Sequence, residues 1–510
     1  MNFLRLEANN KFIQLLIYSV LFVLVIVDRY FILEKFAWVY TDSDQSIMWA
    51  GLSDYSNGIF KEPRFYGQNY NTFLEAFLAV PLFERGIRPN VALPLITSFL
   101  ALLPFVILSL FTLLKKSNLV MSLLILAMPL MLPVSYGMLT SMPRGFVTGI
   151  AIAGLAGVGA FYIRSNWWYF TMFFLVILAY SVNSNSVVLS IPLLLIVFLE
   201  NKYNRNFYLY SFLGLLLGAS LHASVQYFYK VHPFYNLHPL WMDYSLKALL
   251  KSLEHMDYFL NYNMPIMWSS GSLILLVFLL IAYVFWKQGN RNKSYAFMSV
   301  PFLILFTLGF EKVHQGTHSI FFHYSRMFLA IPILLSLGLS FIHIKNKLVL
   351  VIGVLSMSGY FFISHIPALE VAIESNEAYD KLNPVVSLKT SRLENDCSNL
   401  NTICKRHKIE LVVFSQHFFE EPYAYGCGCI NSEFPKTLRP VYERRTWRML
   451  EDDTTIYKTL LLFDLNRDFS KEFLGIKNIE KNLYLIESNT LTTFNLLDSL
   501  KIPYRKFKEE

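Results

Sequence analysis

The chain has 510 residues, of which 55% are apolar and only 16% are charged, and its mean hydropathy is +0.42. A soluble chain of this length needs more charge to cover its surface, so the composition excludes an ordinary soluble protein and predicts a membrane protein. The net charge of +8 does not indicate a nucleic-acid partner, because there is no Lys/Arg-rich run and the basic residues lie in short segments between apolar runs.

The first apolar run, residues 12–33, is long enough to cross a bilayer and has no small-residue cleavage site after Asp28-Arg29-Tyr30. We therefore expect a retained first helix. Further apolar segments bring the expected number of spans to about eleven, although several are shorter than the ~20 residues of a perpendicular helix. The segments lie near 12–33, 91–114, 119–138, 146–163, 167–182, 185–200, 207–229, 265–286, 295–310, 326–343 and 347–364.

Loop charge predicts the orientation of these spans. With the N-terminus inside, every predicted inner loop is basic; these loops carry Lys115, Lys116, Arg164, Lys202, Arg205, Lys287, Arg291, Lys293, Lys345 and Lys347. Eleven spans then satisfy the positive-inside rule and place residues 366–510 outside. The weakest division is between 167–182 and 185–200, because only Asn183-Ser184-Asn185-Ser186 separates them. A single helix over 167–200 would invert everything downstream.

The first predicted outer loop, residues 34–90, carries an acidic pair, Asp42 and Asp44, just beyond the first helix. One interpretation is N-capping, since Asp44 precedes an amphipathic run. The alternative is a carboxylate held at the membrane surface as a general base or a metal ligand. The other charged residues singled out in this loop are Asp54, Lys61, Arg64 and Glu75.

Later outer segments add basic candidates. Arg144 lies in a short outer loop and Arg326 lies at the start of the tenth span, where interfacial snorkelling is as good an explanation as function. His222 lies inside a span, where a satisfied intramembrane histidine is the plain alternative to a site residue. The outer segment 311–325 carries three histidines that could form a metal site with Asp42 or Asp44: His314, His318 and His323.

The terminal segment, residues 366–510, is expected to form a small α/β domain without a recognisable catalytic motif. The sequence predicts a helix end near 404–408 and strands at 409–414, 459–463 and 483–486. All four cysteines lie in this segment: Cys397, Cys404, Cys427 and Cys429. An even number confined to one outward domain predicts disulfides, with three connectivities open. Zinc is the rival interpretation, weakened because no CxxC accompanies the pair Cys427-Gly-Cys429.

The first outer loop resembles the corresponding loop of the GT-C superfamily of membrane glycosyltransferases. The resemblance is to the protein O-mannosyltransferase and aminoarabinose-transferase branch (glycosyltransferase family 39 type). Bacterial members read roughly Asp-Glu-Ala-Ile, Phe-x-Gly-Gln-x-Tyr and Leu-Glu-Ala. The matching residues here are Asp44-Gln45-Ser46-Ile47, Phe65-Tyr66-Gly67-Gln68-Asn69-Tyr70 and Leu74-Glu75-Ala76. Weaker matches are Arg144-Gly145-Phe146, residues 185–192 and Ser325-Arg326-Met327-Phe328. Gln45 stands where the family usually has Glu, and Met327 where it often has Tyr.

The resemblance implies an α-helical GT-C-like membrane domain over 1–365 and an extracytoplasmic α/β domain over 366–510, in a bacterial cytoplasmic (inner) membrane. It implies that a sugar passes from a polyprenyl-phosphate carrier to a glycan, lipid or protein acceptor. The implied roles are general base for Asp44, with Asp42 as a nearby substitute, donor-phosphate binding for Arg326, Arg144, Lys61 and Arg64, and substrate binding for Gln68, Tyr70, Tyr66 and Glu75.

Three alternatives stay open beside this hypothesis. A divalent metal could take part in the reaction. A transporter or lipid flippase would show polar residues in the middle of spans and two related halves. A polysaccharide polymerase would also use lipid-linked sugars and outward loops, with arginines in place of an early-loop carboxylate.

Overall fold

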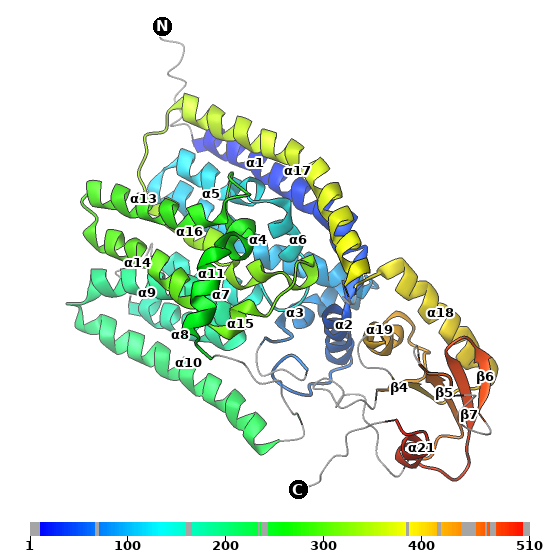
Figure 1. Ribbon diagram of the computed structural model, residues 1–510. Coiled ribbons are helices and arrows are strands. Elements are labelled where there is room, and N and C mark those ends of the chain that lie inside the picture. Colours follow the sequence, from blue (N-terminus) through cyan, green and yellow to red (C-terminus); the bar gives the residue numbers. More distant parts are fainter. Residues whose placement is uncertain are drawn as a thin grey trace. The chain divides into compact units, whose positions relative to one another are not determined.

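The computed structural model describes residues 11–66, 71–159, 166–232, 235, 243–383, 387–415, 420–439, 455–464, 467–469 and 476–502. The chain divides into two compact units. The membrane unit comprises Met1–Ala37, Pro94–Val225 and Leu240–Asn383. The loop–terminal unit comprises Trp38–Leu93, Gln226–Pro239 and Pro384–Glu510. Figure 1 labels most of their helices and several of their strands.

The membrane unit is built from helices, two of which (α4 and α10) continue along the chain into the loop–terminal unit. Its helices are α1 (Lys11–Ile32), α4 (Pro89–Lys116), α5 (Leu119–Met131), α6 (Val134–Leu139), α7 (Thr148–Val158), α8 (Asn166–Val182), α9 (Val187–Asn201), α10 (Arg205–Val231), α11 (Leu246–Glu254), α12 (Met256–Leu260), α13 (Ile274–Lys287), α14 (Arg291–Thr307), α15 (Glu311–His314), α16 (Ile331–Phe341) and α17 (Leu348–Leu382). Short 3-10 or π segments are η1 (Leu33–Ala37), η3 (Ser184–Ser186), η4 (Asn261–Asn263), η5 (Gly271–Leu273), η6 (Ile320–Phe322) and η7 (Tyr324–Phe328).

Within the described residues, six helical segments are long and apolar enough to cross a membrane: Lys11–Ala37, Pro89–Lys116, Ser184–Asn201, Arg205–Val231, Tyr324–Phe341 and Leu348–Leu382. Shorter helices occupy the other apolar segments that the sequence predicts as spans. The prediction of a polytopic helical membrane protein is therefore confirmed, while the exact number of crossings stays a prediction.

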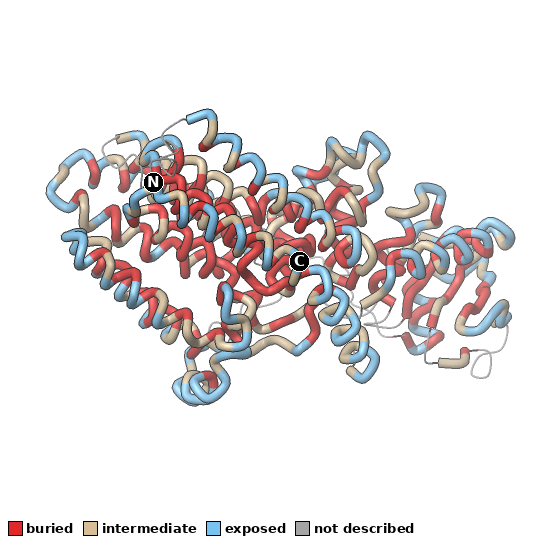
Figure 2. The backbone as a smooth tube through the Cα atoms, turned by 90° about the horizontal axis from the view of Figure 1, so that it is seen from above, coloured by how far each residue is buried: buried red, intermediate tan, exposed pale blue. Residues whose placement is uncertain are grey.

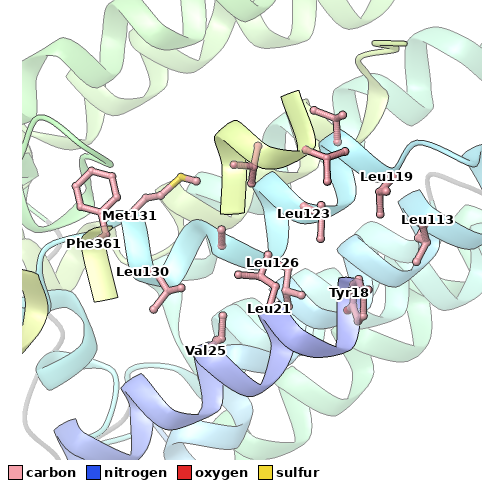
Figure 3. Close-up of a cluster of buried hydrophobic side chains, with 14 of the residues drawn as sticks. Tyr18, Leu21, Val25, Leu113, Leu119, Leu123, Leu126, Leu130, Met131 and Phe361 are labelled. Atoms are coloured by element: carbon pink, nitrogen blue, oxygen red, sulfur yellow. The ribbon is translucent and has the colours of Figure 1, made fainter. Parts of the chain in front are cut away.

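The core of the membrane unit is packed around α5, whose residues are nearly all buried. A helix that is apolar on every side belongs in the interior, and α1 and α17 cover it with apolar residues spaced three or four apart. Tyr18, Leu21 and Val25 of α1 belong to this cluster, together with Phe361 of α17 (Figure 3). The residues on the outer faces of the helices are exposed (Figure 2), so these faces are available to contact lipid.

The chain leaves the helical path at Leu132-Pro133, between α5 and α6. Proline cannot continue the helical hydrogen bonds, and main-chain carbonyls freed inside a membrane protein need other donors. Trp268 Nε1 donates to the Met131 carbonyl at 2.7 Å, and His365 Nε2 donates to the Leu132 carbonyl at 2.8 Å. The other ring nitrogen of His365 lies 2.8 Å from a carboxylate oxygen of Asp28. Buried polar contacts thus join α1 and α17 to this break.

Helices α8 and α9 form an antiparallel pair. The hydroxyl of Tyr169, near the start of α8, donates to Asn201 Oδ1 at 2.7 Å, at the end of α9. Between the two helices, the Asn183 side chain caps η3 by accepting from the Asn185 main-chain N–H at 3.1 Å. The prediction of two separate helices over 167–200 is therefore confirmed.

The loop–terminal unit combines the first outer loop with a small sheet. Its elements are β1 (Tyr40–Asp42), α2 (Ser43–Ser56), α3 (Leu74–Phe83), β2 (Ser387–Lys389), α18 (Thr390–His407), β3 (Leu411–Phe414), α19 (Glu421–Ile430), β4 (Lys436–Leu438), β5 (Thr459–Phe463), β6 (Lys477–Glu480), β7 (Leu483–Glu487) and α21 (Thr493–Ser499). The strand order of the larger sheet is β4-β3-β5-β7-β6, with β3 parallel to both β4 and β5. The predicted α/β character is confirmed, and β3, β5 and β7 lie at the three predicted strands.

The cysteines are used unequally. Cys397 of α18 and Cys427 of α19 form a disulfide, and neither Cys404 nor Cys429 takes part in it. The disulfide prediction is therefore confirmed for one pair. Helix α17 continues to Leu382, so it crosses the predicted domain boundary at 365/366 without a break. That boundary and the outward orientation of the terminal domain stay predictions.

The first outer loop is attached to the terminal segment by main-chain pairing. Strands β1 and β2 are antiparallel, and Tyr40 is paired with Lys389. The Thr390 main-chain N–H donates to the Val39 carbonyl at 2.8 Å, which extends the ladder. Helix α19 packs against α2, and a Cβ at Gly426 would lie 3.7 Å from the Trp49 ring, at ordinary contact distance. The segment that carries Asp42 and Asp44 is thus built into the terminal module.

Candidate active site

Asp42 and Asp44 lie at the junction between β1 and α2. Asp42 is the N-cap of α2, and its carboxylate accepts a hydrogen bond from the Gln45 main-chain N–H at 2.9 Å. The capping interpretation therefore applies to Asp42, which is buried. Asp44 lies in the first turn of the helix and is more exposed than Asp42. The first turn of a helix favours a negative charge, and Asp44 is the more accessible carboxylate of the two.

Gln45 is a candidate that the sequence marks only as a departure from the family pattern. Its side chain is 2% exposed, and its Nε2 has no hydrogen-bond partner among the described residues. A buried amide without a partner costs about 1–3 kcal/mol, so such groups call for an explanation. A ligand oxygen that accepts a hydrogen bond from the Gln45 side chain, next to Asp44, is one such explanation. Its burial could not be predicted from the sequence.

Two buried carboxylates, one near the end of α2 and one after that helix, are paired with tyrosines. Asp54 accepts from the Tyr66 hydroxyl at 2.6 Å, and Glu62 accepts from the Tyr229 hydroxyl at 2.9 Å. Burial first, and then the charges of Asp54 and Glu62, raise the pKa of Tyr55 to about 12. The Tyr55 hydroxyl is therefore protonated at neutral pH and cannot serve as a base. The contact between Glu62 and Tyr229 joins residues far apart in sequence, and no pattern indicated it.

The remaining candidates of the first loop have varied surroundings. Arg64 and Glu75 are buried, and Lys61 is partly buried. The Arg64 main-chain N–H donates to the Tyr229 hydroxyl at 3.0 Å, next to Glu62. Gln68 and Tyr70 lie outside the described residues, so their substrate-binding roles stay predictions.

In the membrane unit, the two arginines proposed for the donor phosphate share one aromatic ring. The guanidinium carbon of Arg326 lies 3.9 Å from the centroid of the Phe322 ring, and that of Arg144 lies 5.7 Å from the same centroid. Both side chains are buried. Two buried positive charges repel each other, so their convergence favours an anion between or beside them. Phe322 belongs to the aromatic run before Arg326, but the approach of Arg144 could not be foreseen.

Arg326 also fixes the loop in which it lies. Its NH1 donates to the carbonyls of Phe322 at 3.0 Å and His323 at 2.9 Å, and its NH2 donates to the Gln315 carbonyl. The side chain is 2% exposed. A snorkelling arginine keeps its guanidinium in water, so the structure contradicts that explanation. Its role at a donor phosphate stays a prediction.

The histidines of this loop do not form a metal site. His323 is stacked on Tyr262 with ring centroids 4.0 Å apart, and its Nδ1 accepts from the Ser325 main-chain N–H at 3.2 Å. His314 Nε2 donates to the Leu308 carbonyl at 2.9 Å. Within the described part of the chain, no three His, Cys, Asp or Glu side chains are grouped to hold a metal ion. The histidine site considered from sequence is therefore not found there.

His323 is neutral at physiological pH. Burial first, and then the charges of His318 and Arg326, lower its pKa to about 3. His222 shares a hydrogen bond of 2.8 Å with Ser181, as the satisfied-histidine interpretation predicts.

Comparisons with known proteins identify the fold. No family model and no curated protein matches the sequence. The chain is similar in structure to ArnT from Cupriavidus metallidurans in the apo state, with 11% identity, a TM-score of 0.56, and coverage of 92% of this chain and 97% of that chain. It is likewise similar to that ArnT bound to undecaprenyl phosphate, with 11% identity, a TM-score of 0.57, and coverage of 93% and 99%. ArnT is an aminoarabinose transferase of the GT-C family, so the predicted GT-C architecture is confirmed at the level of the fold.

Proposed function

We propose that the chain is an integral-membrane glycosyltransferase that moves a sugar from a polyprenyl-phosphate carrier to an extracytoplasmic acceptor. The observation that carries the proposal is the convergence of Arg144 and Arg326 on Phe322, within a chain that has the ArnT fold. An ArnT structure contains undecaprenyl phosphate, which supports a carrier of the same class for this chain. The arginine pair supplies the charge that such a headgroup needs.

In the proposed reaction, Asp44 accepts the proton of an acceptor hydroxyl while that oxygen attacks the anomeric carbon of the sugar. The bond between the anomeric carbon and the phosphate oxygen breaks, and the polyprenyl phosphate leaves with the bonding electrons. Arg326 and Arg144 stabilise the negative charge that grows on the leaving phosphate. The Gln45 amide donates a hydrogen bond to a substrate oxygen and so orients it beside Asp44.

Replacement of the base tests this mechanism. Asp44→Asn keeps the size of the side chain but cannot accept the proton, so turnover should fall about 10²- to 10⁴-fold. The measurement is transfer of labelled sugar from a polyprenyl-phosphate donor to extracted acceptors in membranes that contain equal amounts of each variant. Asp243→Asn is the matched control, because Asp243 is an exposed aspartate of a later loop. Wild-type turnover by Asp44→Asn would overturn the assignment.

A polysaccharide polymerase is the second candidate, and the same arginine pair favours it, because its arginines would do the work without an early-loop carboxylate. The two candidates differ in product and in sensitivity to Asp44. A polymerase should extend a lipid-linked glycan into long chains and should keep its activity in Asp44→Asn. Transfer of one sugar, lost in that variant, supports the transferase.

A further inference from the structure

A second basic cluster lies at the end of α16 that is remote from Arg326. The helical segment Tyr324–Phe341 contains Arg326 near its start and ends at Phe341. Its 18 residues span roughly 30 Å, which is the thickness of the hydrocarbon core of a bilayer. Arg326 and Phe341 are 15 positions apart, or roughly 23 Å of helix, so the two basic clusters of the membrane unit are separated by most of the hydrocarbon thickness.

Two lysines share the ring of Phe341. Lys116 Nζ lies 4.3 Å from the ring centroid, and Lys293 Nζ lies 5.1 Å from it. Lys116 also donates to the Ser340 carbonyl at 2.9 Å, and Lys293 forms an ion pair with Glu200. One carboxylate thus faces two ammonium groups, and the neighbouring Arg291 adds a third cation. Positive charge exceeds negative charge, which favours a bound anion.

A cavity opens beside this cluster. Its volume is about 240 Å³, and it is lined by Glu200, Gly289, Asn290, Arg291, Asn292 and Lys293. The cavity lies at the start of α14, where Asn290 makes no side-chain capping bond. The start of a helix also carries a partial positive charge, which adds to that of the basic side chains and favours an anion. This volume accommodates a phosphate group with part of its substituent.

The surroundings of the cavity place it at a membrane boundary. Three candidate spans end at the cluster: Pro89–Lys116, Ser184–Asn201 and Tyr324–Phe341. Trp286 and Tyr295 are half-exposed next to it, with ring centroids 6.0 Å apart, and Arg291 lies over Trp286 at 5.5 Å. Aromatic and basic side chains at the ends of spans are typical of the headgroup level.

We propose that this cavity binds the phosphate of an anionic membrane lipid, in the leaflet opposite the Arg144–Arg326 pair. Arg291 and Lys293 contact the phosphate, and Lys116 adds charge behind them. Glu200 opposes binding, because its carboxylate competes with the phosphate for Lys293. The proposal does not depend on sugar transfer.

The test uses the full chain, purified in detergent and delipidated, with native mass spectrometry and thermal unfolding as readouts. Phosphatidylglycerol should bind and raise the unfolding midpoint, whereas zwitterionic phosphatidylcholine and inorganic phosphate should do so much less. Each cation that contacts the anionic headgroup contributes enough for about a fivefold change in affinity. Arg291→Gln and Lys293→Gln should therefore each weaken phosphatidylglycerol binding about fivefold, and Glu200→Gln should strengthen it.

Lys287→Gln is the control, because Lys287 is the last residue of α13, next to the same connection, but does not line the cavity. It should leave lipid binding unchanged. Arg291 is exposed, so the result for Arg291→Gln does not depend on an intact buried ion pair. Equal binding of the two phospholipids, or equal effects of Arg291→Gln and Lys287→Gln, would overturn the proposal. Inorganic phosphate as effective as the lipid would overturn the assignment to a lipid.

Discussion

Arg144 and Arg326 lie over the same ring but differ in their other contacts. Arg326 donates to three carbonyls of its own loop, whereas Arg144 also lies 5.3 Å from the Phe146 ring. A hydrogen bond to a charged group contributes about 1.5–3 kcal/mol, so loss of either guanidinium should raise the KM for the lipid-linked donor tenfold or more. The KM for the acceptor should change little.

Arg326→Gln should also lower the thermal unfolding midpoint, because buried loop carbonyls lose their donor. The measurements are donor and acceptor KM values together with thermal unfolding. Arg85→Gln, at an exposed position, is the control. Equal losses for donor and acceptor in Arg326→Gln would show a structural role in place of phosphate binding.

His323 should make the protein sensitive to acid. The unfolded chain binds a proton at this residue near the ordinary pKa of about 6.5, whereas the folded chain does so only near 3. Between these values the unfolded state binds more protons, so stability falls as the pH is lowered from 7 to 4. In His323→Asn, the side chain still accepts from Ser325 but does not titrate. The loss of thermal midpoint between pH 7 and pH 4 should therefore be smaller than in the wild type; an equal loss would contradict the pKa.

At the scale of elements, the disulfide should stabilise the helix that supports α2. Cys397–Cys427 closes a loop of 30 residues and joins α18 to α19, which packs against α2. Closing a loop of this size contributes about 2–4 kcal/mol to the free energy of unfolding. Cys397→Ser should lower the thermal midpoint of the full chain, and sugar transfer should fall with it. Cys429→Ser, which removes a thiol outside this disulfide, should do neither. An unaffected midpoint in Cys397→Ser would contradict the supporting role of α19.

The sequence predicts elements best where one physical signal dominates. Long apolar runs predict the helices of the membrane unit, and short apolar runs between polar segments predict β3, β5 and β7. Strand β1 has three residues, too few for any periodicity, and its partner β2 lies some 345 positions later. Which aspartate caps α2, and that Gln45 is buried, depend on packing from distant elements. Long-range packing is also what brings Arg144 and Arg326, about 180 residues apart, to Phe322.

At the scale of the whole molecule, orientation in the membrane stays the main prediction. The antiparallel pair of α8 and α9 supports an odd number of spans before the terminal segment. Alkaline phosphatase fused after residue 510 should therefore be active outside the cytoplasm, whereas a fusion after Lys345 should be inactive. Protein amounts measured by immunoblotting serve as the control. The reverse pattern would place the arginine pair on the cytoplasmic side and would exclude an extracytoplasmic reaction.

The pairing of β1 with β2 has a consequence for biosynthesis. Asp42 is paired with Ser387, so the strand that leads into α2 cannot complete its ladder until almost the whole membrane unit has been translated. At roughly 5–20 residues per second, ribosomes need on the order of 20–70 seconds to make the intervening chain. During that interval the segment that carries Asp42 and Asp44 has been made, but its partner strand β2 and helix α19 have not. Assembly of the proposed catalytic segment is therefore a late event, and a newly inserted, unfinished chain lacks it.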